Sequence, residues 1–125
     1  MRVSIFLFIS AAALFCGCSG DRLFQGRGDA GQFILQRAHD YGGHPITTNG
    51  LPTLGGDWRY IKHKSVVGVL FPVARYSEVD AYLRLAFGPP ANSIGWTVRD
   101  IGVYIHILRT DTDTEVDIIS PNGDR

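Results

Sequence analysis

The sequence predicts one small α+β domain. Two segments, 29–41 and 77–87, carry apolar residues at helical spacing. A near-continuous apolar run at 65–73 predicts a buried strand, and alternating residues between 94 and 119 predict several more. The length of 125 residues, with 45% hydrophobic and 19% charged residues, fits a single globular domain. We therefore expect an N-terminal helix, then a strand and a helix, then a C-terminal antiparallel β-meander.

The first helix is expected over residues 29–41. Asp29 is a favourable N-cap, and Gly42 with Gly43 supplies a C-terminal stop. The residues that share the apolar spacing are Phe33, Ile34, Ala38 and Tyr41, with Leu35 alongside. Residues 43–57 are rich in glycine and proline and predict a loop.

The middle of the chain predicts strands followed by a second helix. Residues 58–61 are a candidate strand, and 65–73 predicts a strand that is buried on both faces. Ser77 is the expected N-cap of the second helix, with Asp80 where a capping box places an acid. The Gly-Pro-Pro sequence at 88–90 ends this helix.

The last third of the chain predicts the meander. Residues 94–99 are a candidate strand, 101–109 alternate clearly, and 110–114 predict a polar turn. One face of the alternating strand carries Ile101, Val103, Ile105 and Ile107, and the other carries Tyr104, His106 and Leu108. The return strand contains Val116, Ile118 and Ile119.

Four acids follow each other at every second position, at Asp111, Asp113, Glu115 and Asp117. On one continuous strand they would share a face, with neighbours about 6.6 Å apart. That spacing could bind a hard cation such as calcium, or place the two carboxylates of an inverting glycosidase. However, the stretch spans the predicted turn. We therefore interpret it as a solvated hairpin tip that protects a sheet edge, with cation binding and catalysis as alternatives.

The four histidines, His39, His44, His63 and His106, include no pair at the spacing of a helical zinc-protease motif. His106 lies on the less apolar face of its strand, and we interpret it as structural. A small periplasmic hydrolase that uses His106 or the acids near 111 remains an alternative.

Aromatic and basic residues combine at Trp58, Tyr60, Lys62 and Lys64. Such a combination can form a contact surface for a protein or glycan partner. We favour the simpler interpretation, in which the two aromatic residues point into the core and the lysines are solvated.

The N-terminus has the features of a secretory signal. Arg2 precedes an uncharged apolar run from Val3 to Phe15, which is about 13 residues long. A membrane-spanning helix needs roughly 20 apolar residues, so a permanent span is the weaker interpretation.

The end of this run, Phe15-Cys16-Gly17-Cys18, resembles the lipobox of bacterial lipoproteins. Gly17 matches the small residue before the cleavage site, whereas Phe15 stands where leucine is usual. The resemblance implies that Cys18 receives a diacylglyceryl group, that the chain is cleaved before it, and that acyl chains such as palmitate complete the anchor. Ordinary signal cleavage after Gly20 is the alternative.

These features divide the chain into a signal peptide at 1–17, a lipidated N-terminus with a flexible tether at 18–28, and one domain at 29–125. A tether of that length would reach about 35 Å. Since the lipoprotein resemblance associates aspartate after the cysteine with inner-membrane retention, Ser19 favours the outer membrane, facing the periplasm.

The composition also narrows the function. The net charge is zero and no Lys/Arg block appears, which argues against nucleic acid as a partner. The chain has no cysteine after position 18, so the mature domain has neither a disulfide nor a cysteine nucleophile. We predict no cofactor and no metal. We expect a small membrane-anchored envelope lipoprotein acting as a non-enzymatic binding or structural module, with an envelope protein or glycan as partner. The alternatives are a small periplasmic hydrolase and an inhibitor or immunity-type protein against a secreted hydrolase.

Overall fold

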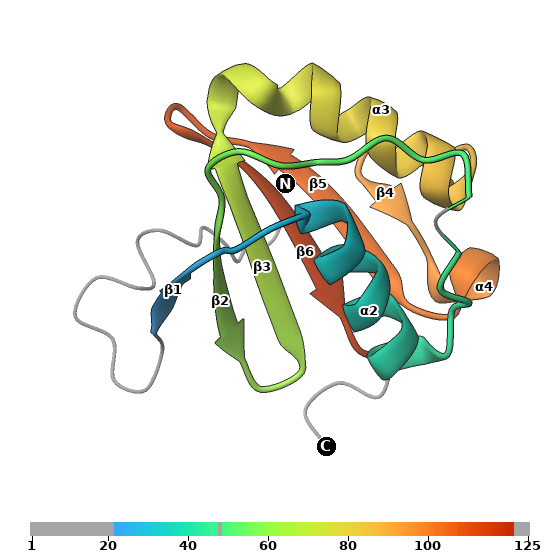
Figure 1. The fold of residues 1–125 in the computed structure, drawn as a ribbon. Coiled ribbons are helices and arrows are strands. Elements are labelled where there is room, and N and C mark those ends of the chain that lie inside the picture. The colour runs from blue at the N-terminus through green and yellow to red at the C-terminus, as the bar shows by residue number, and fades with distance from the viewer. Residues whose placement is uncertain (1–21, 48, 122–125) are drawn as a thin grey trace.

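The structure is a computed structural model that describes residues 22–47 and 49–121. Within them, helices α2 and α3 cover one face of a six-stranded sheet (Figure 1). The α+β class is confirmed. The elements follow in chain order as β1 Leu23–Gln25, α2 Ala30–Gly42, β2 Arg59–His63, β3 Val66–Pro72, the 3-10 helix η1 Val73–Arg75, α3 Tyr76–Phe87, β4 Gly95–Trp96, α4 Val98–Ile101, β5 Tyr104–Arg109 and β6 Asp113–Ile119.

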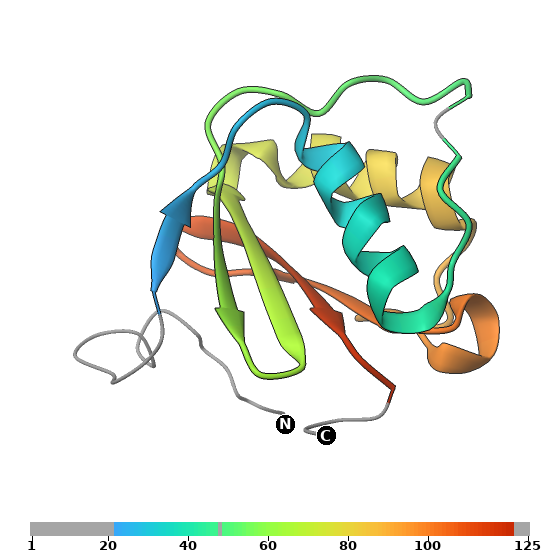
Figure 2. The ribbon, with the colours of Figure 1, turned by 60° about the horizontal axis from the view of Figure 1, so that its bottom comes forward.

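The sheet is antiparallel throughout, with the strand order β1-β2-β3-β6-β5-β4. The final strand, β6, lies between β3 and β5 and is therefore central. Strands β4, β5 and β6 form a meander at one side, and β2 and β3 form a hairpin at the other. Figure 2 shows both long helices above the same face of the sheet.

The core lies between this face and the two helices. From the helices, Ile34, Leu35 and Leu83 are fully buried. The strands contribute alternate residues, because successive side chains on a strand point to opposite faces. The strand residues on the core face are Val67, Val69, Phe71, Ile105, Ile107, Val116 and Ile118.

Helix α2 begins where the sequence predicts. The carboxylate of Asp29 accepts hydrogen bonds from the amides of Gly31 and Leu54, both at 2.9 Å. The second bond attaches the loop between α2 and β2 to the start of the helix. Asp29 therefore acts both as the N-cap and as a tie between two segments far apart in the sequence.

The predicted tether at 18–28 is too long. Residues 23–25 form β1, which pairs with β2 through Phe24 opposite Tyr60. Gly26 N donates to Trp58 O at 2.8 Å, and Trp58 Nε1 donates to Gly28 O at 3.0 Å. The fold therefore begins before residue 29. A three-residue strand is too short to show the alternation by which strands are recognised.

Three further boundaries differ from the prediction. The strand expected at 101–109 begins only at Tyr104, because Ile101 belongs to α4. Helix α3 begins at Tyr76, so Ser77 lies inside the helix and Arg75 is the N-cap residue, without a side-chain capping bond. Arg75 instead pairs with Glu78, with Nε to Oε1 at 2.9 Å. Of the strand expected at 94–99, only Gly95 and Trp96 are extended, because α4 follows at once.

None of the helices in the described part of the chain is long and apolar enough to span a bilayer.

Candidate functional site

Three acids lie on the sheet face opposite α2 and α3. Strand β6 begins at Asp113, so Asp113, Glu115 and Asp117 alternate on one continuous strand. Glu115 and Asp117 are only 5% and 6% exposed, whereas Asp111 is exposed in the turn. The interpretation of this stretch as a solvated tip is therefore wrong for Glu115 and Asp117, and it holds for Asp111.

Glu115 and Asp117 form a hydrogen-bonded carboxyl pair. Burial raises the pKa of Asp117 well above its ordinary value, and the charge of Glu115 raises it further. Burial also raises the pKa of Glu115, but its hydrogen bond with Asp117 opposes that shift. The hydrogen bond between the two groups lowers the pKa of Glu115 and raises that of Asp117. Asp117 therefore holds the proton and donates the hydrogen bond to Glu115. The two carboxyl groups thus share one proton.

The carboxyl pair lies between two neighbouring strands. Asp117 is opposite Gly68 on β3 and opposite His106 on β5. A Cβ atom on Gly68 would lie 3.1 Å from Asp117 Oδ1, which shows that the carboxyl occupies the space above this glycine. Burial lowers the pKa of His106, which favours a neutral ring near pH 7.

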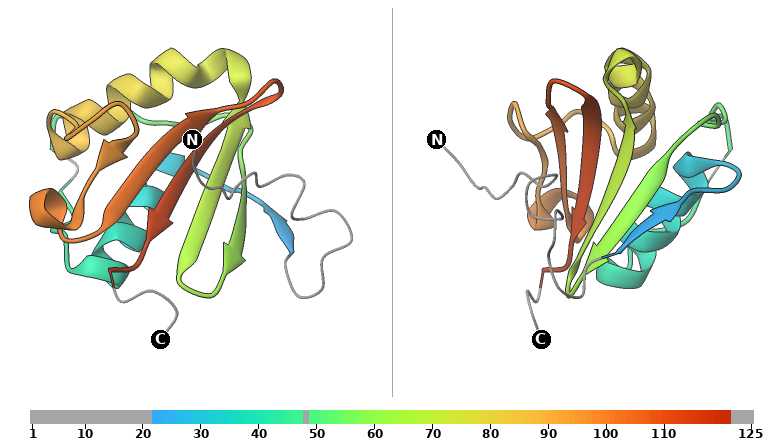
Figure 3. Two further views of the ribbon diagram at one scale, coloured as in Figure 1. Left: turned by 180° about the vertical axis from the view of Figure 1, so that it is seen from behind. Right: turned by 90° about the vertical axis from the view of Figure 1, so that its left-hand side faces the viewer.

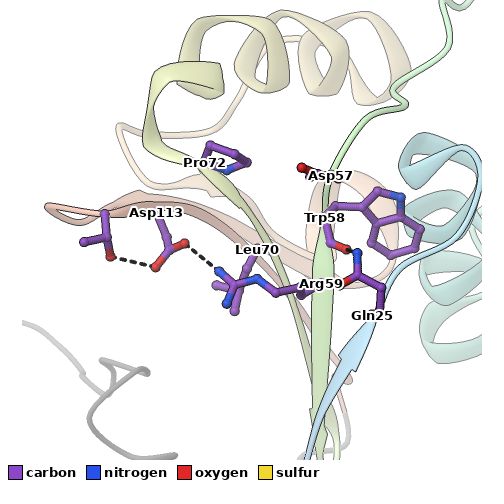
Figure 4. A pocket seen from close by; sticks show the side chains of 8 residues that line it. Gln25, Asp57, Trp58, Arg59, Leu70, Pro72 and Asp113 are labelled. Carbon is purple, nitrogen blue, oxygen red and sulfur yellow. Dashed lines mark hydrogen bonds and ion pairs between the residues drawn. The ribbon is translucent and has the colours of Figure 1, made fainter.

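A pocket of about 440 Å³ lies at one end of the same strands (Figure 4). Arg59 and Asp113 form an ion pair in its lining, with Nη2 to Oδ1 at 2.8 Å. Thr112 Oγ1 donates to the other oxygen of Asp113 at 2.8 Å. The pocket is lined by Gln25, Asp57, Trp58, Arg59, Leu70, Pro72, Thr112 and Asp113. It offers hydrogen-bond donors and acceptors beside the apolar Leu70 and Pro72.

The pocket and the carboxyl pair are neighbours but not one site. Leu70 lines the pocket and is the cross-strand partner of both Arg59 and Glu115. Glu115 is thus two strands away from Arg59, with Leu70 between them. His106 does not line the pocket. Of the candidate site residues named from the sequence, Asp113 and Trp58 line the pocket.

The other histidines lie elsewhere. His39 Nδ1 is 3.2 Å from His44 O near the end of α2, and the ring of His44 packs on Phe87. Burial lowers the pKa of His44. His63 ends β2. Among the described residues, no group of three or more histidine, cysteine, aspartate or glutamate side chains is arranged to hold a metal ion.

The candidate contact residues Trp58 and Tyr60 differ in burial. Trp58 is 2% exposed and belongs to the core, as predicted. Tyr60 is half-buried and stacks on Phe24 with ring centroids 5.1 Å apart, while Lys62 is exposed.

Sequence reasoning missed Gln25 and Arg59 as pocket residues. Gln25 falls in the segment assigned to the tether. Arg59 pairs with Asp113, which is 54 positions away, so no local pattern signals the contact.

Cys18 and the signal segment lie outside the described residues, so lipidation stays a prediction.

Comparison of the chain with known protein families, with curated proteins and with solved structures finds no match.

Proposed function

We propose that this protein is a lipid-anchored module of a bacterial envelope that binds a partner without catalysing a reaction. The partner is an envelope protein or glycan that presents hydrogen-bonding groups to the pocket between β1–β2 and the β5–β6 turn. The pocket itself is the observation that carries this proposal, because it gathers Gln25, Arg59 and Asp113 from three distant segments at one opening.

The chemistry of the pocket supports a polar ligand. The Arg59 side chain is 41% exposed and that of Asp113 is 17% exposed. An ion pair with this exposure contributes little to stability, since water screens it. A ligand can therefore exchange hydrogen bonds with both groups at little cost to the fold, while Leu70 and Pro72 provide an apolar contact.

The length of the chain before β1 supports a position close to the membrane. Leu23, the first residue of β1, follows Cys18 by five positions. Five residues span at most about 18 Å, half the reach expected from the sequence. A domain anchored at Cys18 would meet only partners that lie near the bilayer surface.

Site-specific photo-crosslinking in cells tests the binding proposal. A photoreactive amino acid replaces Asp57, which lines the pocket, or Leu85, which is 63% exposed on α3. We expect a discrete adduct from position 57 only. Adducts from both positions, or from neither, would overturn the proposal.

Paired variants show whether the adduct depends on the pocket. The double variant Arg59→Ala/Asp113→Ala should abolish it. Arg84→Ala/Asp80→Ala removes a comparable exposed ion pair on α3, with Nε to Oδ2 at 3.0 Å, and should leave the adduct intact. Mass spectrometry of the adduct then separates a glycan from a protein, and a secreted hydrolase as partner would identify the inhibitor role.

A hydrolase is the second candidate. The observation that favours it is the buried carboxyl pair of Glu115 and Asp117 opposite His106, because paired carboxyl groups serve as acid and base in hydrolysis. Glu115→Gln or Asp117→Asn at unchanged stability should abolish the cellular phenotype of a hydrolase. Loss of the phenotype only in the Arg59 and Asp113 variants supports binding instead.

A further inference from the structure

Aromatic and cationic side chains form a continuous row across β1, β2 and α2. The Arg22 guanidinium lies 5.8 Å from the ring centre of Phe24, which stacks on Tyr60 at 5.1 Å. Tyr60 contacts Phe33 at 4.7 Å, and Arg37 lies 5.2 Å from the Phe33 ring centre. Lys62 follows Tyr60 on the same face of β2. We call this set the basic–aromatic surface: Arg22, Phe24, Phe33, Arg37, Tyr60 and Lys62.

This surface differs from the chain as a whole in charge. The whole chain has a net charge of zero, whereas the surface carries three cations. Asp40 pairs with Arg37 at 2.8 Å and offsets one of them. Phe24 is 38% exposed at the sheet edge. Positive charge and exposed apolar rings therefore occur together.

The same surface lies where the chain arrives from Cys18. Strand β1 is the edge strand of the sheet, and Arg22 immediately precedes it. The right-hand view of Figure 3 shows β1 at the near margin, with α2 beside it and α3 further up. If Cys18 is held in a bilayer, the margin formed by β1 is the part of the domain that must lie nearest to it.

We propose that the basic–aromatic surface contacts the headgroups of an anionic phospholipid membrane. Aromatic side chains favour the membrane interface, and cations close to anionic lipids gain electrostatic attraction. Phe24 reaches toward the acyl boundary while Arg22 and Lys62 pair with phosphates. The geometry of this proposal rests on the proposed anchor at Cys18, which fixes the side that faces the bilayer.

The pocket would then stay accessible when the basic–aromatic surface contacts lipid. Gln25 and Arg59 are cross-strand partners on the opposite face of β1 and β2 from Phe24 and Tyr60. A partner could therefore occupy the pocket while the basic–aromatic surface is in contact with lipid.

The experiment uses the chain from Cys18 onward, which contains every described strand and helix and a single cysteine. That cysteine is coupled to a maleimide phospholipid in vesicles, so attachment does not depend on cellular lipidation. Phe24→Trp places a fluorescent probe in the surface, and Leu85→Trp places a control probe on α3. Trp58 and Trp96 are 2% and 1% exposed and give a constant background.

Quenching by brominated phospholipids then reports contact with the bilayer. We expect strong quenching of Phe24→Trp in vesicles that contain phosphatidylglycerol, and little quenching of Leu85→Trp. High salt should reduce the quenching, since the screening length falls from about 10 Å at 0.1 M to about 3 Å at 1 M. Equal quenching of both probes, or equal quenching in pure phosphatidylcholine, would overturn the proposal.

Charge variants test the role of the cations. Arg22→Gln and Lys62→Gln, each combined with Phe24→Trp, should each lower the equilibrium constant for contact of the surface with the bilayer, measured by quenching, roughly five-fold. Arg99→Gln, which removes an exposed cation from α4, should change it little. Unquenched Phe24→Trp together with a protein crosslink from position 24 would assign the surface to a protein partner instead. Since attachment is chemical, these outcomes do not depend on whether cells lipidate Cys18.

Discussion

Asp117 on β6 occupies the space above Gly68 on β3: a Cβ atom on Gly68 would lie 3.1 Å from Asp117 Oδ1 and 3.6 Å from Glu115 Oε2. A glycine at the centre of a sheet is unfavourable in itself, because it has no side chain to pack. Here its small size leaves room for two carboxyl groups between neighbouring strands. The carboxyl pair and the glycine therefore depend on each other.

Gly68→Ala should destabilise the protein by about 1–2 kcal/mol, because the added methyl group crowds the Asp117 carboxyl in a close-packed region. Gly68→Val should cost more. The free energy of unfolding in urea measures the effect. Gly55→Ala is the matched control, since no atom lies within 4 Å of its Cβ position, and it should change the free energy little. A Gly68→Ala variant as stable as the wild type would contradict the proposed packing.

The shared proton makes stability depend on pH. Because the pKa of Asp117 is raised in the folded state, the folded chain holds a proton that the unfolded chain releases above about pH 4. The stabilisation is fully present below that pH and is lost as the pH rises through the raised pKa. The titratable groups that face this proton are Glu115 and Asp113 on β6 and His106 on β5.

Asp117→Asn should flatten this decline. Asparagine has the same shape and can donate to Glu115, but it cannot ionise. Urea midpoints measured from about pH 4 upward should fall less steeply than those of the wild type. Asp111→Asn, in the exposed turn, should keep the wild-type slope. If Asp117→Asn kept that slope too, another group would have to hold the proton.

Asp29→Ala should cost about 2 kcal/mol, because it removes the N-cap of α2 and leaves the Leu54 amide without its acceptor. Thermal or urea unfolding measures the loss. Asp29→Asn retains an acceptor and should recover part of it. Asp40→Ala, which removes an exposed pair with Arg37 and an exposed hydrogen bond from Gln36, should stay within about 0.5 kcal/mol of the wild type. Equal losses for Asp29→Ala and Asp40→Ala would refute the tie between α2 and the loop.

Trp58→Phe should loosen β1 more than the rest of the sheet. The change removes the hydrogen bond from Trp58 Nε1 to Gly28 O, worth about 1 kcal/mol. Amide exchange should accelerate in residues 22–28. Trp96→Phe removes an equivalent bond, from Nε1 to Gly88 O at 2.9 Å, and should leave residues 22–28 unchanged. Unaltered exchange in Trp58→Phe would show that the tryptophan does not hold β1.

The sequence predicts those elements that are long enough to show a helical or an alternating pattern of apolar residues. The alternation in β5 correctly separates Ile105 and Ile107 from Tyr104 and His106. Strand β1 escapes detection because three residues pair with β2 without a pattern of their own. The start of β6 depends on Thr110, whose hydroxyl accepts from the Asp113 amide at 2.9 Å and shortens the turn. The register of β6 with β3 and β5 then places Glu115 and Asp117 opposite Leu70 and Gly68.

The pocket could not be predicted because its residues meet only after the sheet forms. Arg59 reaches Asp113 across β3, the strand that separates β2 from β6. The sequence shows the alternating acids, but the burial of Glu115 and Asp117 depends on β3 and β5, which lie on either side of β6. A cross-sheet neighbour such as Gly68 has no signature in the sequence around position 117.

We propose that the mature protein is anchored by lipid on Cys18 with its domain close to the bilayer. The intact mass of the protein extracted from the bacterial envelope tests it most directly. We predict a chain that begins at Cys18 and carries a diacylglyceryl group and an additional acyl chain, with membrane association lost in Cys18→Ala. An unmodified chain that begins at Asp21 would contradict lipid anchoring at Cys18.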